Sequence, residues 1–260
     1  MSVLTIDEAR GEVRIERADG TGARFAMATA EAFEAVSAAW LRCGWDVKYV
    51  YGFTWLGRPV IQLPEDLLRL QEVLWRERPD VIVETGVAHG GSLIFHASLC
   101  ALMGHGNVIG IDREIRAPAR AALAAHALAA RIDLIEGDSA APATLAAVRA
   151  RIAPDARVLV VLDSGHARTH VRAELEAYAP LLRPGGLFVV CDGIMAALHG
   201  APRAADDWTW NNPLGAIADF LEAHTEFRAE EPDFPFNEGA VRRRVTYWPR
   251  GFLRRAGATA

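Results

Sequence analysis

The sequence has few cysteines, no long apolar run and no excess of positive charge. Its three cysteines, Cys43, Cys100 and Cys191, stand apart without CxxC spacing, which argues against a disulfide framework and a structural zinc site. No apolar stretch reaches the roughly 18 residues that a membrane-spanning helix needs. The net charge of −5 offers no general attraction to nucleic acid or to an anionic membrane. We therefore expect a small-molecule partner.

Several motifs of export and catalysis are also missing. The first residues, MSVLTIDEARGEVRIER, lack the basic and apolar regions of a signal peptide, so we expect a cytoplasmic protein. The sequence contains no GxSxG elbow, no HExxH zinc motif and no GxxxxGK[ST] phosphate loop, which disfavours hydrolases and nucleotide triphosphatases. With 260 residues, of which 51% are hydrophobic, the chain can still bury a sizeable core.

Five acidic residues stand at the ends of five apolar runs. The runs VIVE, VIGID, DLIEGD, VLVVLD and LFVVCD end at Glu84, Asp112, Asp138, Asp163 and Asp192, with gaps of 28, 26, 25 and 29 residues. A strand followed by a crossover helix takes about 25 to 30 residues, so the pattern predicts successive parallel strands. One or two such acids could be helix N-caps. Five in phase favour a ligand-binding crevice at the carboxyl ends of a doubly wound, Rossmann-like α/β sheet.

The residues around these runs complete the predicted organisation. Residues 1–79 form an N-terminal helical and cap segment, with a helix over 28–42 and another that begins at Pro64. Residues 80–260 form the cofactor-binding domain. The segment 45–64, rich in Trp, Tyr and Gly, is either a surface loop that buries its own aromatic rings or a cap over a ligand.

The second half of the sheet is predicted from weaker signals. The alanine-rich runs near 117–130 and 140–152 fit crossover helices. Residues 226–231 and the VRRRVTYWP segment at 241–249 would form two strands that finish the sheet antiparallel. We expect the tail GFLRRAGATA, from residue 251, to fray.

The turn after VIVE carries the most specific signal. In TGVAHGGS, Gly86, Gly90 and Gly91 allow a sharp turn and a close approach to a ligand, and Ser92 can help to start a helix. The spacing is GxxxGG and not the GxGxxG of dinucleotide sites, and Glu84 would repel a pyrophosphate and attract an ammonium. Asp112 ends the next strand, where a carboxylate can accept both hydroxyls of a ribose.

These motifs resemble the class I S-adenosylmethionine-dependent methyltransferases, and more specifically the cephalosporin hydroxylase family, which groups with sugar and macrolide O-methyltransferases. The resemblance covers roughly residues 45–255 and includes TWLGRPVIQLPEDL, RPDVIVETGVAHGGSLIFHASL, NVIGIDREIR, RIDLIEGDS, VLVVLDSGHARTHVRAEL, YAPLLRPGGLFVVCDGI and WNNPLGAIADFL. It implies that the turn from Glu84 to Ser92, His89 included, holds the methionine part of S-adenosylmethionine. It also implies that Asp112 with Arg113 meets the ribose and that Asp138 with Ser139 lies beside the adenine.

The segment LDSGHARTH carries the expected reaction centre. Asp163 and His166 are three residues apart at a strand end, so both can point into one crevice, and histidine can take a proton from an attacking hydroxyl at neutral pH. Similar macrolide-sugar methyltransferases use a histidine at this spacing as base and the aspartate as a magnesium ligand. His170, four residues further on, could compete for the role of base. Asp163 is counted with the cofactor site as well.

A magnesium ion is the second cofactor that we consider. Asp163 and Asp192 could supply two oxygen ligands from neighbouring strand ends. Metal-dependent relatives carry a Glu-Asp pair at the fifth strand, whereas this chain has Cys191-Asp192, and a thiolate is a poor magnesium ligand. Asn212 is a further candidate ligand through its amide oxygen, and Trp208 and Trp210 could stack on a sugar or ring face.

We predict an S-adenosylmethionine-dependent O-methyltransferase that acts on a hydroxyl of a sugar or other natural-product scaffold. One alternative is a non-catalytic subunit that binds S-adenosylmethionine and assists a partner enzyme. Less favoured alternatives are a natural-product hydroxylase, with iron held by His166, His170 and Asp163, and a nicotinamide-dependent reductase. The acceptor, the atom methylated and a homo-oligomeric state stay open.

Overall fold

The computed structural model describes residues 2–257, which divide into two compact units. The small unit runs to Tyr49 and takes up Asp233–Thr246 again, and the large unit holds Val50–Pro232 and the chain from Tyr247 onward. The functional division that we drew between residues 79 and 80 stays a prediction.

The small unit is a three-stranded antiparallel sheet followed by a long helix. Its elements are β1 (Ser2–Asp7), β2 (Glu12–Arg17), β3 (Gly22–Ala26) and α1 (Ala30–Asp46). Thr29 caps the helix, because its side chain accepts a hydrogen bond from the backbone N–H of Ala32. The helix was predicted over 28–42, and the strands were not predicted. The returning segment is held by an ion pair of 3.2 Å between Arg242 Nη1 and Glu31 Oε1.

The large unit is built on a seven-stranded sheet in the order β11-β12-β10-β9-β6-β7-β8. The strands are β6 (Val81–Thr85), β7 (Asn107–Asp112), β8 (Ile132–Glu136), β9 (Val158–Leu162), β10 (Leu187–Val190), β11 (Phe227–Ala229) and β12 (Phe252–Arg255). The five strands from β10 to β8 pair in parallel, and β12 pairs antiparallel with both of its neighbours. The predicted mostly parallel, doubly wound sheet with a C-terminal antiparallel strand is confirmed.

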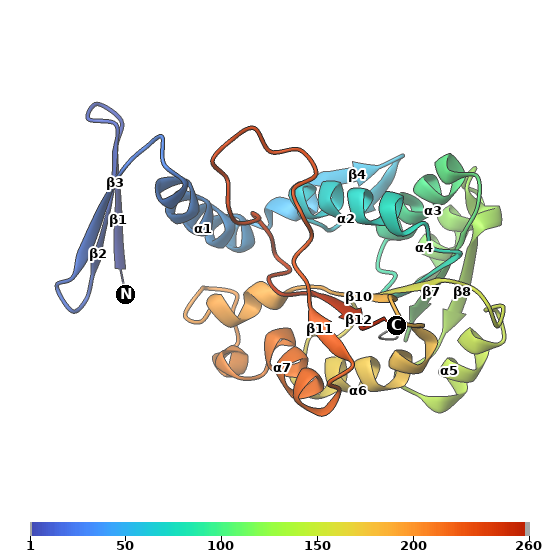
Figure 1. Ribbon diagram of the computed structural model, residues 1–260. Helices are drawn as coiled ribbons and strands as arrows, with labels where there is room; N and C mark the ends of the chain where they lie inside the picture. The colour runs from blue at the N-terminus through green and yellow to red at the C-terminus, as the bar shows by residue number, and fades with distance from the viewer. Residues whose placement is uncertain (1, 258–260) are drawn as a thin grey trace. The chain divides into compact units, whose positions relative to one another are not determined.

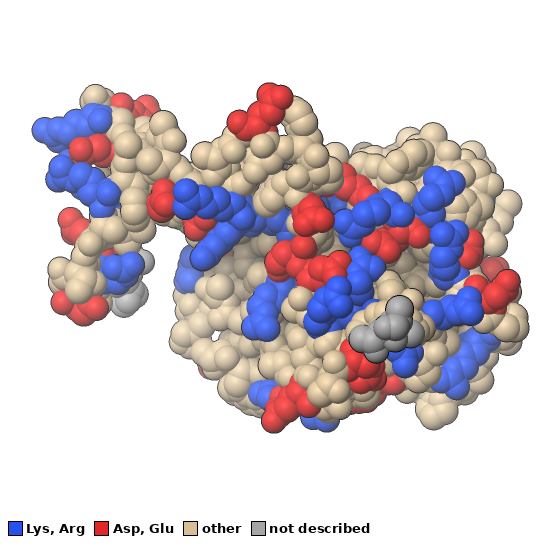
Figure 2. All heavy atoms as spheres, in the orientation of Figure 1, with Lys and Arg blue, Asp and Glu red and all other residues tan. Residues whose placement is uncertain are grey.

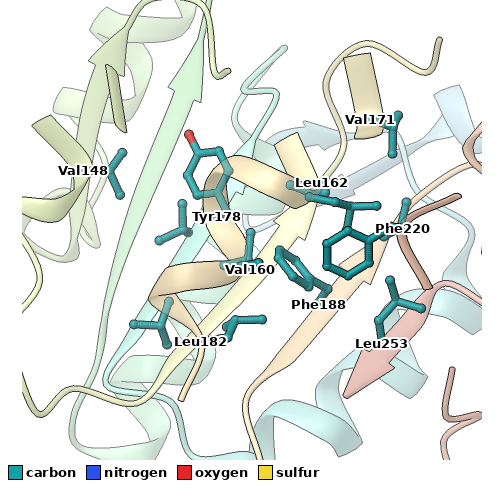
Figure 3. Packing of buried hydrophobic residues seen from close by; sticks show 14 of the residues in the cluster. Val148, Val160, Leu162, Val171, Tyr178, Leu182, Phe188, Phe220 and Leu253 are labelled. Atoms are coloured by element: carbon teal, nitrogen blue, oxygen red, sulfur yellow. The ribbon is translucent and has the colours of Figure 1, made fainter. Parts of the chain in front are cut away.

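Helices cover both faces of this sheet (Figure 1). One face carries α2 (Pro64–Glu77), α3 (Gly91–Met103) and α4 (Ala117–Ala124), and the other carries α5 (Pro142–Arg149), α6 (Arg168–Tyr178) and α7 (Pro213–Ala223). The second face holds the cluster of buried side chains in Figure 3, where Phe188 of β10 meets Phe220 of α7 edge to face at 6.1 Å between ring centroids. Burial of each such side chain stabilises the fold by about 1.5–3 kcal/mol.

The last strand lies later in the chain than we predicted. The segment 241–249 forms no strand, and Phe252–Arg255, which we expected to fray, is β12. Arg242 and Arg243 in the first segment are exposed and its later residues Tyr247 and Trp248 are buried outside the sheet, whereas Phe252 and Leu253 are buried within β12. The end of the predicted tail, residues 258–260, lies outside the described residues.

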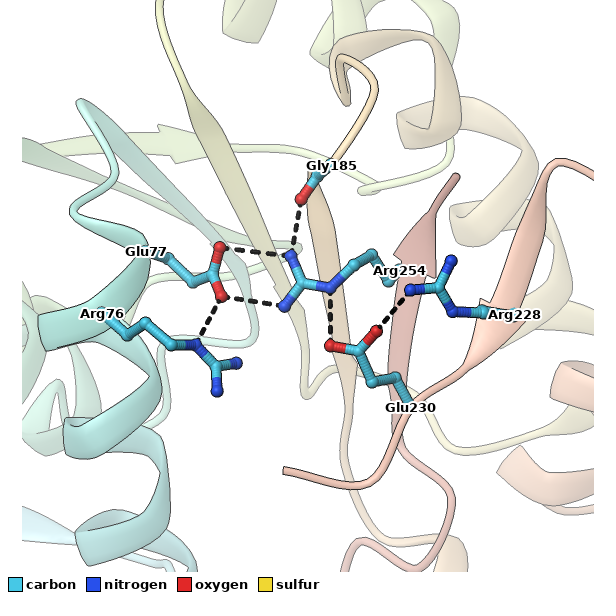
Figure 4. A network of polar contacts seen from close by, with 6 residues as sticks. All are labelled: Arg76, Glu77, Gly185, Arg228, Glu230 and Arg254. Atoms are coloured by element: carbon cyan, nitrogen blue, oxygen red, sulfur yellow. Dashed lines mark hydrogen bonds and ion pairs between the residues drawn. The ribbon is translucent and has the colours of Figure 1, made fainter. Parts of the chain in front are cut away.

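A polar network joins α2 to this last strand (Figure 4). The guanidinium of Arg254 contacts both carboxylate oxygens of Glu77, at 2.8 and 3.2 Å, and donates from Nε to Glu230 at 2.6 Å. It also donates to the carbonyl of Gly185 at 2.7 Å. Glu77, and then Glu230, raise the pKa of Arg254 further above its ordinary value, so β12 is held by a side chain that stays cationic.

The remaining elements are short. They are the hairpin β4 (Phe53–Trp55) and β5 (Arg58–Val60), and the 3₁₀ turns η1 (Tyr49–Gly52), η2 (Ala129–Arg131), η3 (Ala179–Leu181), η4 (Gly193–Ala197) and η5 (Asp206–Thr209). Across residues 2–257, no helix is long and apolar enough to span a membrane. Basic and acidic side chains are interspersed on the face that Figure 2 shows.

Candidate active site

The five acidic residues lie at the carboxyl ends of the five parallel strands, as the sequence spacing predicted. Glu84 is inside β6, Asp112 is the last residue of β7, and the other three follow β8, β9 and β10 within two residues. Because the strands are parallel, these ends meet at one edge of the sheet.

The glycine turn after β6 is shaped by close contacts. Gly86 has a φ of +96°, and a Cβ there would lie 2.1 Å from the carbonyl oxygen of Asp163. At Gly91, a Cβ would lie 2.1 Å from the carbonyl oxygen of Pro59. Ala88 also takes a left-handed conformation, with a φ of +44°, which favours glycine over alanine. The turn is therefore a tight, strained loop between two neighbouring segments.

Asp112 holds this turn in place. Its Oδ2 accepts hydrogen bonds from the backbone N–H groups of Val87 at 2.8 Å and Ala88 at 3.3 Å, and its Oδ1 accepts from Glu114 at 3.3 Å. A charged acceptor at these N–H groups offsets the strain at Ala88. Asp112 thus links the first and second strand ends, in addition to the ligand role that we predicted for it.

A cavity of about 390 Å³ opens at these strand ends. Its lining comes from the turn after β6, the end of β7, the loops after β8 and β9, and the start of α6: Gly86, Ala88, Ile111, Asp112, Arg113, Asp138, Ser139, Asp163, Ser164, Gly165 and His170. A recess of about 40 Å³ beside it is lined by residues that include Gln62, His89, Gly91 and Ser92. The volume of the larger cavity falls in the range of small-molecule sites.

Most of the predicted cofactor residues therefore meet at one place, but Glu84 and Gly90 do not face it directly. Glu84 is 1% exposed, and its Oε2 lies 3.2 Å from Nδ1 of the equally buried His96 on α3. Gly90 is the left-handed N-cap of α3 and lies against the side chain of Leu123. Both residues support the glycine turn without lining the cavity.

Arg113 and Asp138 form the outer rim. Arg113 Nη2 donates to Asp138 Oδ2 at 3.2 Å, and the other oxygen of Asp138 accepts from the backbone N–H of Ala140 at 3.0 Å. That backbone bond, together with Arg113, lowers the pKa of Asp138, so the rim carries a carboxylate at neutral pH.

Asp163, His166 and Asp192 form a compact cluster at the ends of β9 and β10. One ligand atom of each residue lies within 4.8 Å of the others, and His166 Nε2 is 3.3 Å from Asp192 Oδ2. Asp192 has a left-handed backbone, with a φ of +56°, that starts η4 directly after the strand. The structure thus unites the predicted base with both predicted metal ligands.

Two neighbours of Asp163 were not predicted from the sequence to act there. Gln62, which is 6% exposed and follows β5, donates from Nε2 to Asp163 Oδ2 at 2.7 Å. Cys191 is the other neighbour, and its thiol lowers the pKa of Asp163, against the larger effects of burial and of the nearby carboxylates. Burial, and then the nearby carboxylates of Asp163 and Asp192, raise the pKa of Cys191, so it stays a thiol. No sequence spacing could reveal Gln62, because it lies 101 residues from its partner.

The cluster of Asp163, His166 and Asp192 contains more acidic than basic groups. Burial raises the pKa of Asp163, and the carboxylates of Asp192 and Glu84 raise it further. Burial also raises the pKa of Asp192, whereas His166 lowers it. Two carboxylates held close together with one imidazole favour the uptake of a proton or a cation.

His170 occupies a different place from His166. Its Nε2 lies 3.1 Å from Ser164 Oγ, 3.3 Å from Ser139 Oγ and 3.4 Å from Glu174 Oε1. The grouping of Asp163, His166 and Asp192 does not include it. This arrangement weighs against His170 as the competing base and against an iron site made of His166, His170 and Asp163.

The aromatic hairpin packs on the cofactor turn. Trp55 donates from Nε1 to Ser98 on α3 at 3.1 Å and meets the ring of Phe95 edge to face at 5.0 Å. Arg58 donates from Nε and Nη2 to the carbonyl of His89, at 3.1 and 2.6 Å. The hairpin buries some of its aromatic surface, and the residues after it reach the recess.

Asn212 is a helix cap. Its Oδ1 accepts from the backbone N–H of Gly215 at 2.9 Å, and its Nδ2 donates to the carbonyl of Trp208 at 2.7 Å. The suggested amide ligand for a metal is therefore engaged at the start of α7, where asparagine is a favoured N-cap. Trp210 is 59% exposed.

Comparisons with known proteins show which family and which fold this chain resembles. The family model described as Rhamnosyl O-methyltransferase/CmcI matches residues 47–256. The rhamnosyl O-methyltransferase of Mycobacterium leprae (strain TN) is 30% identical over 164 residues, which cover 60% of this chain and 68% of that protein. The enzyme of the same name from Mycobacterium tuberculosis (strain ATCC 25618 / H37Rv) is 28% identical over 154 residues, which cover 56% of this chain and 61% of that protein.

Solved structures show the same fold. An apo structure of CmcI superposes with a TM-score of 0.54 and 24% identity, covering 80% of this chain and 78% of that one. A putative caffeoyl-CoA O-methyltransferase from Staphylococcus aureus gives a TM-score of 0.54 and 18% identity, with 85% and 92% covered. A CmcI structure with magnesium and S-adenosylmethionine gives 0.53 and 22%, with 80% and 78% covered.

Proposed function

Because the chain belongs to the Rhamnosyl O-methyltransferase/CmcI family, we propose that it transfers a methyl group from S-adenosylmethionine to a hydroxyl of a sugar or other natural-product scaffold. The observation that carries this proposal is the placement of the Asp163, His166 and Asp192 cluster beside the cavity of the glycine turn. The small-molecule acceptor was predicted from the sequence, as was a cytoplasmic location, which stays a prediction.

The residues that line the cavity fit S-adenosylmethionine. Gly86 leaves the turn open for the methionine part, Asp112 offers carboxylate oxygens for the ribose, and Asp138 lies at the next strand end for the base. The spatial order β6-β7-β8 matches the order of these parts along the cofactor. Bound S-adenosylmethionine supplies a methyl group on a cationic sulfur, and the acidic edge of the sheet is suited to a cation.

His166 is the proposed general base. Its side chain is 30% exposed, so an acceptor hydroxyl can reach it, and Asp192 at 3.3 Å stabilises the imidazolium that forms when it takes the proton. The rate enhancement would come mainly from holding the acceptor oxygen in line with the methyl group. His166 would then remove the proton as the oxygen attacks.

The cluster can also hold a divalent cation. Asp163 and Asp192 offer two carboxylates, which with water molecules suffice for Mg²⁺. Burial raises the pKa of both side chains, and a bound cation would offset the cost of their buried charge. The Cys191 thiol replaces the carboxylate that the resemblance implies, so this site has one oxygen ligand fewer. A bound metal would lower the pKa of an acceptor hydroxyl and orient it.

The acceptor itself would lie between the residues that follow β5 and the loop 193–212. Gln62 already reaches Asp163 from the first of these segments. The second begins at η4 next to Asp192 and carries Trp208 and Trp210, whose rings can stack on a sugar face.

Titration calorimetry with S-adenosylmethionine, and separately with NADH, tests the cofactor, each with magnesium or with a chelator. We expect micromolar binding of S-adenosylmethionine alone. A screen of sugar and phenolic acceptors should then show methyl transfer that falls at least hundredfold in His166→Ala and persists in His224→Ala, a matched change outside the cavity. Two results together would favour the non-catalytic subunit. The protein would bind the cofactor but methylate no acceptor, and His166→Ala would leave the activity of a partner enzyme unchanged.

A further inference from the structure

Four polar side chains form a hydrogen-bonded group beside the cavity, and three of them, Ser139, Ser164 and His170, line it. Glu174 is fully buried, and its Oε1 lies 2.5 Å from Ser139 Oγ and 2.6 Å from Ser164 Oγ. His170 completes the group, with Nε2 at 3.3 and 3.1 Å from the same two hydroxyls. These residues come from the loops after β8 and β9 and from α6.

The protons of this group can be assigned from its hydrogen bonds. With Glu174 ionised, its carboxylate only accepts, so both serine hydroxyls donate to it. Each hydroxyl has a single proton, so each can only accept from the imidazole. His170 therefore carries its proton on Nε2, and its Nδ1 is a free acceptor whenever the ring is neutral.

The shape of the site turns this acceptor toward the cavity. The Cδ2 and Nε2 edge of His170 faces Gly165 and the serines, because a Cβ at Gly165 would lie 3.1 Å from Cδ2. His170 nevertheless lines the cavity, and its side chain is 24% exposed. The edge left for a ligand is the one that carries Nδ1.

We propose that His170 determines the specificity for the cofactor's base, by accepting a hydrogen bond at Nδ1 from the 6-amino group of adenine. The inference rests on the proposed function, and it assigns a role to a residue that lies outside the cluster of Asp163, His166 and Asp192. A base with a carbonyl at position 6 presents an acceptor oxygen to Nδ1 of His170, which is also an acceptor. No hydrogen bond can form between them, so a buried polar group is left unpaired.

The charged neighbours of His170 set the pH range in which its ring is neutral and Nδ1 can accept a hydrogen bond. The hydrogen bond that His170 donates to Glu174 raises the pKa of His170, Asp138 raises it too, and burial and Arg113 lower it. Binding is therefore measured at a pH at which the ring is neutral. Protonation would turn Nδ1 into a donor and favour the carbonyl.

The experiment compares S-adenosylhomocysteine with S-inosylhomocysteine, which carries a carbonyl in place of the 6-amino group. Titration calorimetry should show the adenine compound binding at least tenfold more tightly to the wild type. In His170→Phe the ratio should fall below about threefold, whereas His224→Phe, which keeps the stacking on Phe220, should leave it unchanged. An unchanged ratio in His170→Phe would overturn the inference alone. No binding of S-adenosylhomocysteine by the wild type would overturn the proposed function as well.

Nitrogen-15 NMR of the wild-type histidines gives an answer that does not depend on a variant folding. The ring of His170 should show the Nε2-protonated tautomer, and the Nδ1 resonance should shift on addition of S-adenosylhomocysteine. A proton on Nδ1 in the neutral ring, or an Nδ1 resonance that ignores the ligand, contradicts the assignment.

Discussion

Asp112 offers a sharp test, because its carboxylate holds the glycine turn and faces the cavity at once. Asp112→Asn keeps a side-chain oxygen that can still accept from the backbone N–H of Val87, so the turn should survive. The same change removes the negative charge and one acceptor from the position proposed for the ribose. Asp112→Ala removes both functions.

The magnitudes follow from these contacts. A hydrogen bond to a charged acceptor is worth about 1.5–3 kcal/mol, which corresponds to a loss of roughly 10-fold to 150-fold in affinity for S-adenosylmethionine. Asp112→Ala also leaves the left-handed backbone of Ala88 without its acceptor. A residue in that conformation costs about 1–2 kcal/mol, so we expect Asp112→Ala to lower the melting temperature by about 2–8 °C.

Calorimetric titration and thermal unfolding of the two variants separate the roles. We expect both variants to bind at least tenfold more weakly, and only Asp112→Ala to melt clearly earlier. An affinity in Asp112→Asn equal to that of the wild type would refute the ribose assignment. Equal melting temperatures for wild type and Asp112→Ala would refute the account of the turn.

Three further predictions concern charge and packing. In the folded state the pKa of Asp163 lies above its value in the unfolded chain. Between these two pKa values the folded state binds a proton that the unfolded chain has released, so the free energy of unfolding falls as the pH rises. In a chelator, Asp163→Asn should therefore melt higher than the wild type at neutral pH, and the difference should vanish below about pH 4; a lower melting temperature at neutral pH contradicts this. Arg254→Met leaves Glu77 with Arg76 as its remaining cation and should lower the free energy of unfolding by roughly 2 kcal/mol in urea titrations, whereas a change near zero would show that Arg254 does not stabilise the fold. Gly91→Ala should abolish cofactor binding, because its Cβ meets backbone at 2.1 Å, while Gly52→Ala, which meets nothing within 4 Å, should bind normally.

The sequence predicted the parallel half of the sheet well, because strand and crossover helix repeat at a nearly constant length. The acids that end these strands could be assigned to one edge without any knowledge of side-chain contacts. The prediction was wrong for the last strand, which we placed in VRRRVTYWP and which the structure places in the following segment, GFLRR. What decides between them is a tertiary contact: at Gly251 a Cβ would lie 2.3 Å from the carbonyl oxygen of Val190, so only this glycine lets the later segment enter beside β10.

The strands of the small unit and the group around His170 were missed for different reasons. In β2, the alternation of Val13 and Ile15 with charged residues was a signal for a strand, and it was not used. The group of Ser139, Ser164, His170 and Glu174 gave no such signal. Its members are brought together only by the positions of the loops after β8 and β9 relative to α6, which no spacing along the chain encodes.

The position of β12 has a consequence for synthesis. It lies between β10 and β11, although the ribosome adds it after both. Until residues 252–255 emerge, β10 keeps an open edge and β11 has no strand beside it. The newborn chain therefore passes through a stage in which the strands that carry the cavity can already pair, while an exposed edge can still capture a neighbouring nascent chain.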